Sequence, residues 1–278
     1  MAPRQDSVVP DSLPTRAATA AVLVVVVLAV LVAGGLVWTA FLVLVAALAA
    51  HELGRLVERR RSQQQRFALA VGLVAVGTVI ATAAGGPAAA LLLFALLLPV
   101  VCGLYALAGG NGLPLGAGAL YLSLPLAALT WLRLDAPRGL LFTLWLLCVV
   151  GATDTAAYFA GRAIGGPRLA PVLSPGKTWA GLFGGMLAAA MVGGLFVLFL
   201  PGHGGAAALF SGVLAMLLAV VAQCGDLAES WIKRRSGYKD SGRILPGHGG
   251  VLDRIDGLLF AAPLYAAIVA ILTGGVFA

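Results

Sequence analysis

Residues 206–233 read AAALFSGVLAMLLAVVAQCGDLAESWIK, and this stretch joins a long apolar run to a sudden group of charges. Its first twenty residues, Ala206 to Gly225, contain no charged side chain. About 20 apolar residues are what an α-helix needs to cross the hydrocarbon core of a bilayer. The stretch therefore predicts a membrane-spanning helix whose polar end begins at Asp226.

The composition of the whole chain agrees with this interpretation. Of the 278 residues, 61% are hydrophobic and only 10% are charged. Soluble domains are about half apolar and about a quarter charged. The composition thus excludes a soluble domain, a disordered chain and, despite the net charge of +7, a nucleic-acid-binding module. We predict an all-α polytopic membrane protein.

Apolar segments separated by polar or glycine-rich breaks predict about nine transmembrane helices. The segments are 17–33, 36–50, 67–84, 88–108, 113–132, 140–160, 179–200, 206–230 and 255–278. Residues 1–16 are polar and predict a disordered tail. The remainder divides into N-terminal transmembrane helices, 17–139, and a C-terminal transmembrane region, 140–278, which carries the candidate catalytic residues.

The loops between these segments form two sets that differ in charge. Sixteen of the 18 Lys and Arg residues lie in the tail and in loops 51–66, 161–178 and 231–254, whereas the other set holds only Arg133 and Arg138. Because Lys and Arg are retained on the cytoplasmic side, we predict an integral inner-membrane (cell-membrane) protein with its charged loops inside. If the first two segments formed one helix, the tail would lie outside, whereas the charged loops would remain on the cytoplasmic side.

Charge is concentrated between positions 226 and 256, where 31 residues include 11 charged ones. Residues three or four apart share one helix face, and a polar stripe of this kind is formed by Asp226, Glu229, Ser230 and Lys233. Asp253 and Asp256 form a similar pair at the start of the last segment. Carboxylates from two neighbouring helices suit a hard divalent cation such as Mg²⁺.

A second interpretation is that Glu229–Lys233 and Asp253–Arg254 are only ion pairs that hold helix ends at the membrane surface. Acidic residues buried in a membrane are costly and usually functional. This favours a role in binding over a role in anchoring, but both interpretations stay open at this point.

The segment between the two helices combines glycine with basic residues, in Lys239-Asp240-Ser241-Gly242-Arg243 and Pro246-Gly247-His248-Gly249-Gly250. Glycine lets backbone N–H groups approach an anion closely. With cations and candidate metal ligands beside it, the segment predicts a polyphosphate site. The same pentapeptide recurs at 201–205 without acidic residues nearby and there predicts only a turn.

A second polar cluster lies around the sixth and seventh apolar segments. Asp154 is inside the sixth, and Ser174-Pro175-Gly176-Lys177-Thr178 precedes the seventh. These letters imitate the end of a P-loop, but Pro171 stands where that motif needs glycine and no strand is predicted before it, so we exclude a P-loop. Ser174, Lys177 and Thr178, at the start of a helix, are candidates to bind phosphate. An ordinary helix cap is the alternative.

Taken together, these residues resemble the signature of phosphatidate cytidylyltransferases (CDP-diacylglycerol synthases). The matching positions, without a gap, are Ser230, Lys233, Arg234, Lys239, Asp240, Pro246-Gly247-His248-Gly249-Gly250, Asp253, Arg254 and Asp256. The stretches 154–178 and 225–230 are similar to further segments of that family, and the first 140 residues match only in being hydrophobic. Ala180 departs from the Glu or Gln that many relatives place there.

The resemblance implies the reaction CTP + phosphatidate → CDP-diacylglycerol + pyrophosphate, with Mg²⁺ and a second, monovalent cation such as K⁺. It also implies helices around a cytoplasm-facing polar cavity, commonly in a homodimer. Asp226, Asp253 and Asp256 would be the metal ligands.

The residues themselves suggest how such a reaction would proceed. A lipid phosphate is already anionic, so charge neutralisation and positioning matter more than a strong base. We predict that the catalytic residues are Asp226, Lys239, Asp253 and Asp256. The predicted substrate-binding residues are Asp154, Ser174, Lys177, Thr178, Glu229, Ser230, Lys233, Arg234, Asp240, His248 and Arg254. Among these, His248 either contacts phosphate or holds the glycine loop.

Two other functions remain open from the sequence. A CTP-dependent lipid kinase would transfer the γ-phosphate, and an ion-coupled transporter would use Asp154, Asp226 and Glu229 as a relay. A transporter predicts acidic residues on both sides of the membrane, whereas these lie towards one side.

Overall fold

The computed structural model describes residues 13–245, 247 and 249–273, and most of them are helical. The helices are α1 (Leu13–Ala33), α2 (Gly35–Val57), α3 (Arg61–Leu107), α4 (Gly112–Leu134), α5 (Gly139–Ile164), α6 (Trp179–Leu198), α7 (Gly205–Arg235) and α8 (Leu252–Leu272). Residues 1–12 of the predicted disordered tail lie outside this range, whereas residues 13–16 already belong to α1.

Seven helices in the described part of the chain, α2 to α8, are long and apolar enough to cross a membrane. The apolar part of α1, Ala17–Ala33, is shorter. Large apolar side chains such as Leu91, Leu195 and Leu217 are about half exposed on the outer faces of the helices. An extensive apolar exterior is unstable in water and is covered by lipid in a membrane. The chain is therefore a helical, integral membrane protein.

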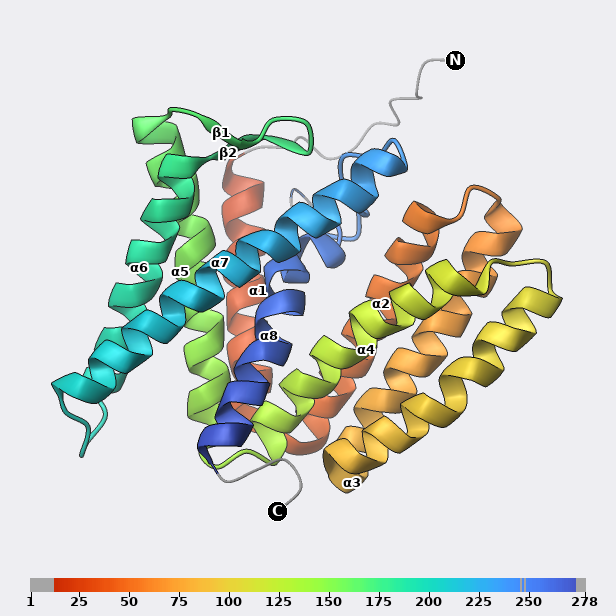
Figure 1. Cartoon of the computed structure of the whole chain (residues 1–278), viewed down its shortest axis with the longest axis horizontal. Coiled ribbons are helices and arrows are strands. Elements are labelled where there is room, and N and C mark those ends of the chain that lie inside the picture. The colour runs from red at the N-terminus through yellow and green to blue at the C-terminus, as the bar shows by residue number, and fades with distance from the viewer. Residues whose placement is uncertain (1–12, 246, 248, 274–278) are drawn as a thin grey trace.

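Helix α3 contains two apolar segments and folds back on itself between them. Its backbone leaves the helical region at Gly85 and Gly86, as the predicted break at 85–86 requires. The rings of Phe67 and Tyr105 lie 6.1 Å apart. A straight helix would separate residues 38 positions apart by about 57 Å, at a rise of 1.5 Å per residue. The two rods of α3 therefore run side by side, as Figure 1 shows.

The fold-back rests on glycine at position 86, and this gives a first testable prediction. Gly86 has φ +72° and ψ −170°, a backbone conformation that costs other residues about 1–3 kcal/mol. Gly86→Ala is expected to lower the thermal unfolding midpoint of the purified protein in detergent. Gly103→Ala, in the second rod where an added Cβ meets nothing within 4 Å, is the control and should leave the midpoint unchanged or slightly higher. Equal midpoints for the Gly86 variant and the parent would contradict the prediction.

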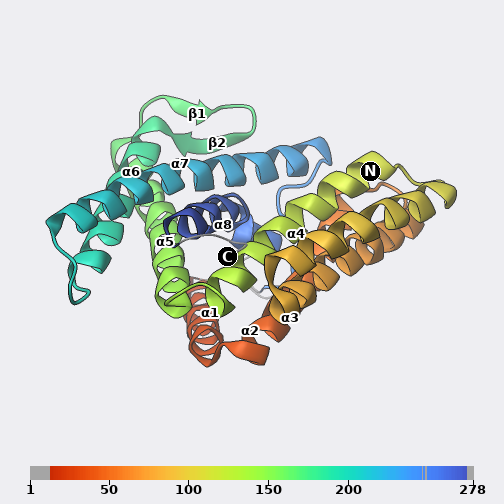
Figure 2. The same ribbon diagram turned by 60° about the horizontal axis from the view of Figure 1, so that its bottom comes forward.

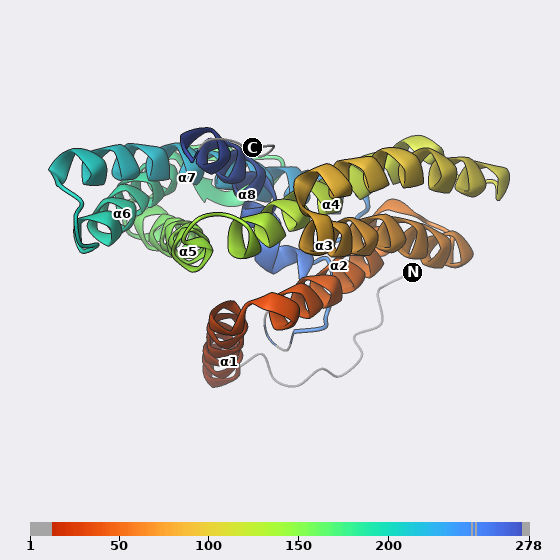
Figure 3. The same cartoon turned by 90° about the horizontal axis from the view of Figure 1, so that it is seen from below.

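The helices form two groups that meet at α8. In one group α3 packs against α2 and α4, and in the other α6 packs against α5 and α7. Helix α8 contacts both α4 and α7 and lies between the groups in Figures 1 and 2. Helix α1 has few contacts, mainly with α2 and α5, and stands apart from the others when the molecule is viewed from below (Figure 3). The centre of the molecule is thus the meeting point of both groups around α8.

Small residues let the helices of the second group approach closely. A Cβ added at Gly193 of α6 would fall 2.7 Å from Cβ of Ala215 in α7. The indole N–H of Trp145 in α5 donates to the carbonyl of Gly193 at 3.1 Å and to Ser211 Oγ at 3.0 Å. Close backbone approach at small residues is the usual way in which helices associate in lipid. These contacts hold α5, α6 and α7 together below the polar residues described next.

The loops separate by charge, as the sequence predicted. The connections that follow α2 and α5 and that join α7 to α8 lie at one end, the upper end in Figure 1, and the turns near residues 34, 86, 136 and 202 lie at the other. One of the upper connections differs from the expected loop. Residues 168–178 form an antiparallel hairpin of β1 (Arg168–Ala170) and β2 (Ser174–Thr178). The polar ends of α2, α5 and α7 and the start of α8 therefore lie at the same end of the molecule as this hairpin.

Candidate active site

The last two turns of α7 carry the polar stripe that the sequence predicted. Lys233 Nζ lies 2.8 Å from Glu229 Oε2, so the expected pair four residues apart is confirmed. Ser230 Oγ donates to Asp226 Oδ1 at 3.3 Å. The Glu229 side chain is completely buried, whereas that of Asp226 is 31% exposed. One helix face therefore presents both a buried and an accessible carboxylate.

The first of two ion-pair networks joins the hairpin to α7 and α5. Lys177 Nζ of β2 lies 2.5 Å from Asp226 Oδ2 and donates to Gln223 Oε1 at 2.8 Å. The side-chain amide of Gln223 in turn donates to Asp154 Oδ1 of α5 at 3.4 Å. Arg234 also reaches the hairpin, since its Nε donates to the carbonyl of Leu173 at 3.3 Å. A basic residue from the hairpin is thereby paired with an acidic residue of α7 and linked through Gln223 to one of α5.

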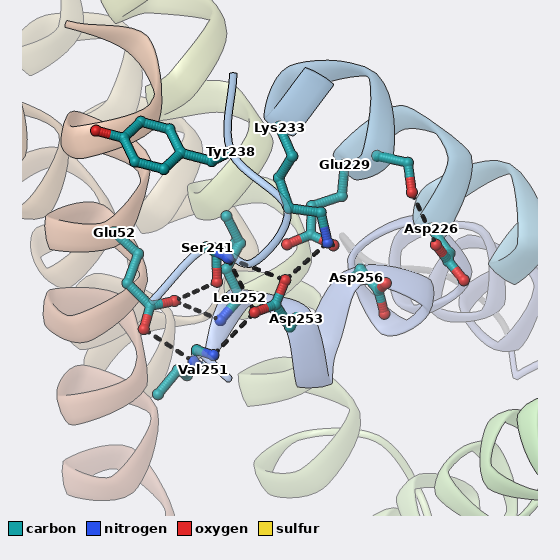
Figure 4. A network of polar contacts seen from close by, with 12 residues as sticks. Glu52, Asp226, Glu229, Lys233, Tyr238, Ser241, Val251, Leu252, Asp253 and Asp256 are labelled. Carbon is teal, nitrogen blue, oxygen red and sulfur yellow. Dashed lines mark hydrogen bonds and ion pairs between the residues drawn. The ribbon is translucent and has the colours of Figure 1, made fainter. Parts of the chain in front are cut away.

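The second network joins α7 to the start of α8. Lys233 Nζ contacts Asp253 Oδ1 at 2.7 Å as well as Glu229, so one ammonium group forms ion pairs with two buried carboxylates. Asp253 Oδ2 also accepts the backbone N–H groups of Ser241 at 3.0 Å and Gly250 at 2.8 Å. Because Ser241 and Gly250 flank the glycine-rich loop, Asp253 fixes both ends of this loop (Figure 4).

Asp256 lies between Asp226 and Asp253 in Figure 4. Its Oδ1 accepts the N–H of Gly257 at 2.8 Å. A Cβ added at Gly225 would collide with the carbonyl oxygen of Asp256, so glycine is what allows α7 and α8 to cross here. The crossing brings Asp256 beside the α7 face that carries Asp226.

Several predicted residues lie elsewhere than expected. Ser174 and Lys177 are in strand β2 and not at a helix N-terminus, and the expectation that no strand occurs here was wrong. Thr178 is the N-cap of α6 and its buried hydroxyl oxygen accepts the N–H of Gly181 at 3.0 Å, which is the ordinary cap that we weighed as the alternative. Among the predicted residues that the structure describes, the exposed ones are Asp154, Arg234, Lys239, Asp240 and Arg254. His248 lies outside the described residues.

The three aspartates do not form a ready-made metal site. In the part of the chain that the structure describes, no three His, Cys, Asp or Glu side chains are grouped closely enough to hold one ion. Asp226 is paired with Lys177 and Asp253 with Lys233, so ammonium groups balance two of the three carboxylates. Glu229 Oε1, in contrast, is buried without a hydrogen-bond partner. This oxygen is an unsatisfied acceptor beside the predicted ligands.

Two residues of the site escaped the sequence analysis. Glu52 of α2 is completely buried and accepts hydrogen bonds from Ser241 and from the start of α8. Gln223 bridges Lys177 and Asp154. Both had a signal in the sequence, because Glu52 is the first acidic residue after Asp11 and Gln223 is the only Gln after residue 65. Gln223 lies within an apolar run and Glu52 directly after one, and polar side chains in such positions need partners.

Comparison with known proteins identifies the family of the chain. The model of the cytidylyltransferase family matches residues 14–272. A Brucella suis protein named phosphatidate cytidylyltransferase is 55% identical over 158 residues, which are 56% of each chain. A Haemophilus influenzae protein of that name is 43% identical over 134 residues, or 48% of this chain and 46% of the relative.

The aligned segment thus spans about half the length of these relatives. The family match is broader, since it runs from the start of α1 to the end of α8 and includes every contact described above. The chain belongs to the cytidylyltransferase family.

Proposed function

We propose that this protein transfers CMP from CTP to phosphatidate, giving CDP-diacylglycerol and pyrophosphate. The observation that carries the proposal is the convergence of Lys177, Lys233 and three aspartates from β2, α7 and α8 at one end of the helices. The relatives from Brucella suis and Haemophilus influenzae bear the name of this activity. Both substrates are negatively charged. The site supplies the ammonium groups of Lys177 and Lys233, at the level of the membrane surface where a lipid headgroup would lie.

The reaction requires two negatively charged groups to meet. An oxygen of the lipid phosphate attacks the α-phosphorus of CTP, and the bond from that phosphorus to the oxygen bridging the β-phosphate breaks, so that pyrophosphate leaves. The attacking oxygen is already anionic, so no strong base is needed. Lys177 can exchange its partly exposed carboxylate partner, Asp226, for phosphate oxygens. Lys233, Arg234 and Lys239 add positive charge nearby. Positioned cations of this kind account for much of the catalysis in phosphoryl transfer.

The donor set fits a hard divalent cation such as Mg²⁺. Mg²⁺ is usually bound by one or two carboxylates together with substrate phosphates and water, and it does not require an all-protein cage. We assign Asp226 and Asp256 to the ion, with Asp253 beside them, and the unsatisfied Glu229 Oε1 supports extra positive charge here. Bound there, the ion would neutralise charge on the phosphates. The K⁺ ion, the polar cavity and the homodimer implied by the resemblance stay predictions.

We place the site on the cytoplasmic side of the cell membrane, where CTP is available. Support comes from the loops at the same end, which hold most of the Lys and Arg residues, the ones retained in the cytoplasm. We also propose nine crossings, made by α1, α2, the two rods of α3 and α4 to α8. Both statements can be checked by labelling single cysteines placed in the loops.

Labelled CTP tests the reaction directly. Purified protein supplied with phosphatidate, Mg²⁺ and CTP labelled at the α-phosphate should transfer the label to lipid, whereas label at the γ-phosphate should appear in pyrophosphate. A lipid kinase gives the reverse, with γ label in the lipid. A transporter that uses Asp154, Asp226 and Glu229 as a relay labels no lipid at all. Either of these results would overturn the proposal.

A further inference from the structure

Glu52, near the end of α2, is a fully buried acidic residue that accepts three hydrogen bonds. Its Oε2 accepts Ser241 Oγ–H at 2.9 Å and the N–H of Leu252 at 2.8 Å, and its Oε1 accepts the N–H of Val251 at 3.0 Å. The donors are about 190 to 200 residues away in the sequence. Burying a carboxylate is costly unless its oxygens are hydrogen-bonded, and here both oxygens are (Figure 4).

This carboxylate completes the N-terminus of α8. The first N–H groups of a helix have no partners within the helix, and Val251, at the N-cap position, has no side chain that can cap them. Two acidic residues accept N–H groups at and just before this helix end. Asp253 accepts the N–H of Gly250, and Glu52 accepts those of Val251 and Leu252. A negative charge is favourable at this end of a helix, so Glu52 acts as the cap that α8 lacks.

Glu52 also holds the loop that leads to α8. Ser241 donates its backbone N–H to Asp253 and its hydroxyl to Glu52, so the two carboxylates hold one residue from both sides. A Cβ added at Gly242 or Gly250 would collide with the Glu52 carboxylate. These two glycines, which the sequence analysis assigned to phosphate binding, are therefore required for a second reason: they make room for Glu52.

We propose that Glu52 is a positioning residue of the active site. It sets where α8 begins and where Ser241 lies, and through them it places Asp253 and Asp256 against α7. It does this without contacting the substrates, since Ser241 and the α8 N-terminus lie between. The inference rests on the proposed function for its kinetic test, and on the hydrogen bonds alone for its structural test.

Glu52→Gln is the sharpest variant because it keeps the shape of the side chain and replaces one of its two acceptor oxygens with an NH₂ donor. The side-chain amide has one acceptor oxygen and an NH₂ group, which would face backbone N–H groups. We expect the amide protons of residues 250–252 to exchange with solvent at least about tenfold faster, because their hydrogen bonds weaken. We expect kcat to fall about 20-fold or more with the KM for CTP changed less than about threefold, since displacements near 1 Å in a catalytic group cost up to about 100-fold in rate.

Glu58→Gln is the matched control. Glu58 follows α2, is also acidic, and accepts the hydroxyl of Tyr105 at 2.7 Å, away from Ser241 and α8. It should leave both kcat and the exchange of residues 250–252 as in the parent. The proposal is overturned if Glu52→Gln keeps kcat and exchange within about threefold of the parent, or if the two variants lose activity alike.

Ser241→Ala keeps the test decisive if Glu52→Gln does not fold. It removes one of the three hydrogen bonds, so kcat should fall about three- to tenfold, in line with the net contribution of one typical intramolecular hydrogen bond. When both single variants fold, the double variant should be no slower than Glu52→Gln, because residues acting through one contact are not additive. Additive losses, or a normal kcat for Ser241→Ala, would overturn the proposal. A parent that transfers no CMP instead overturns the proposed function, and exchange at residues 250–252 still decides the role of Glu52.

Discussion

Asp256→Asn is expected to lower the rate of CMP transfer by about 100-fold or more while the protein stays folded. The carboxylate of Asp256 lies between Asp226 and Asp253 at the crossing of α7 and α8, where we place the divalent cation. The amide of Asn can still accept the N–H of Gly257, so local structure is preserved and only the charge is lost. Removing one charge-stabilising group from a preorganised site typically costs 10²–10³ in rate.

Asp135→Asn is the control for this change. Asp135 is the exposed C-cap residue of α4, at the opposite end of the helices from the site. The measurement is kcat for lipid labelling at saturating CTP and Mg²⁺, normalised to the protein that elutes as a single species. If Asp256→Asn keeps a third or more of the parent rate, the assignment of Asp256 to the ion is wrong.

Lys233→Met should cause the largest loss of stability. Lys233 is the partner of two buried carboxylates, at 2.8 Å from Glu229 and 2.7 Å from Asp253. Removing one partner of a buried ion pair leaves charges without compensation and costs about 3–5 kcal/mol. The free energy of unfolding, measured in mixed micelles with increasing fractions of sodium dodecyl sulfate, should fall by that amount.

Two further variants separate the ion pair from other effects of Lys233→Met. Adding Glu229→Gln removes one of the uncompensated charges, and should recover a substantial part of the loss. Lys239→Met makes the same chemical change at an exposed position, and should leave the unfolding free energy as it is. An unfolding free energy for Lys233→Met equal to that of the parent would show that the buried pair contributes nothing to stability.

The helices could be predicted from the sequence because each long apolar run needs only its own backbone hydrogen bonds to enter lipid. The predicted segment 206–230 corresponds to α7, and the predicted break at Gly34-Gly35 separates α1 from α2. The pair Glu229–Lys233 was predictable for the same reason, since it depends on the spacing of one helix. Features that depend only on neighbouring residues could therefore be predicted from the sequence.

The rest of the site depends on contacts between distant segments, which spacing does not encode. Hairpin β1–β2 was missed because its strands are only three and five residues long, and the longer one, β2, contains proline and glycine. Glu52 stands at the start of the polar loop 51–66, and nothing in its sequence neighbours points to Ser241 or Leu252. Neither motif predicts that Lys177 pairs with Asp226; the sequence predicted only that Lys177 binds phosphate.

The long sequence separation between Glu52 and α8 has a consequence for biosynthesis. When α2 leaves the ribosome, the residues that will satisfy its carboxylate are about 200 positions from being made. At about 5–20 residues per second, translation takes about 10–40 s to reach them. During that interval Glu52 has to stay near water or lipid headgroups, so α2 settles into its final depth only after the last helix has been inserted.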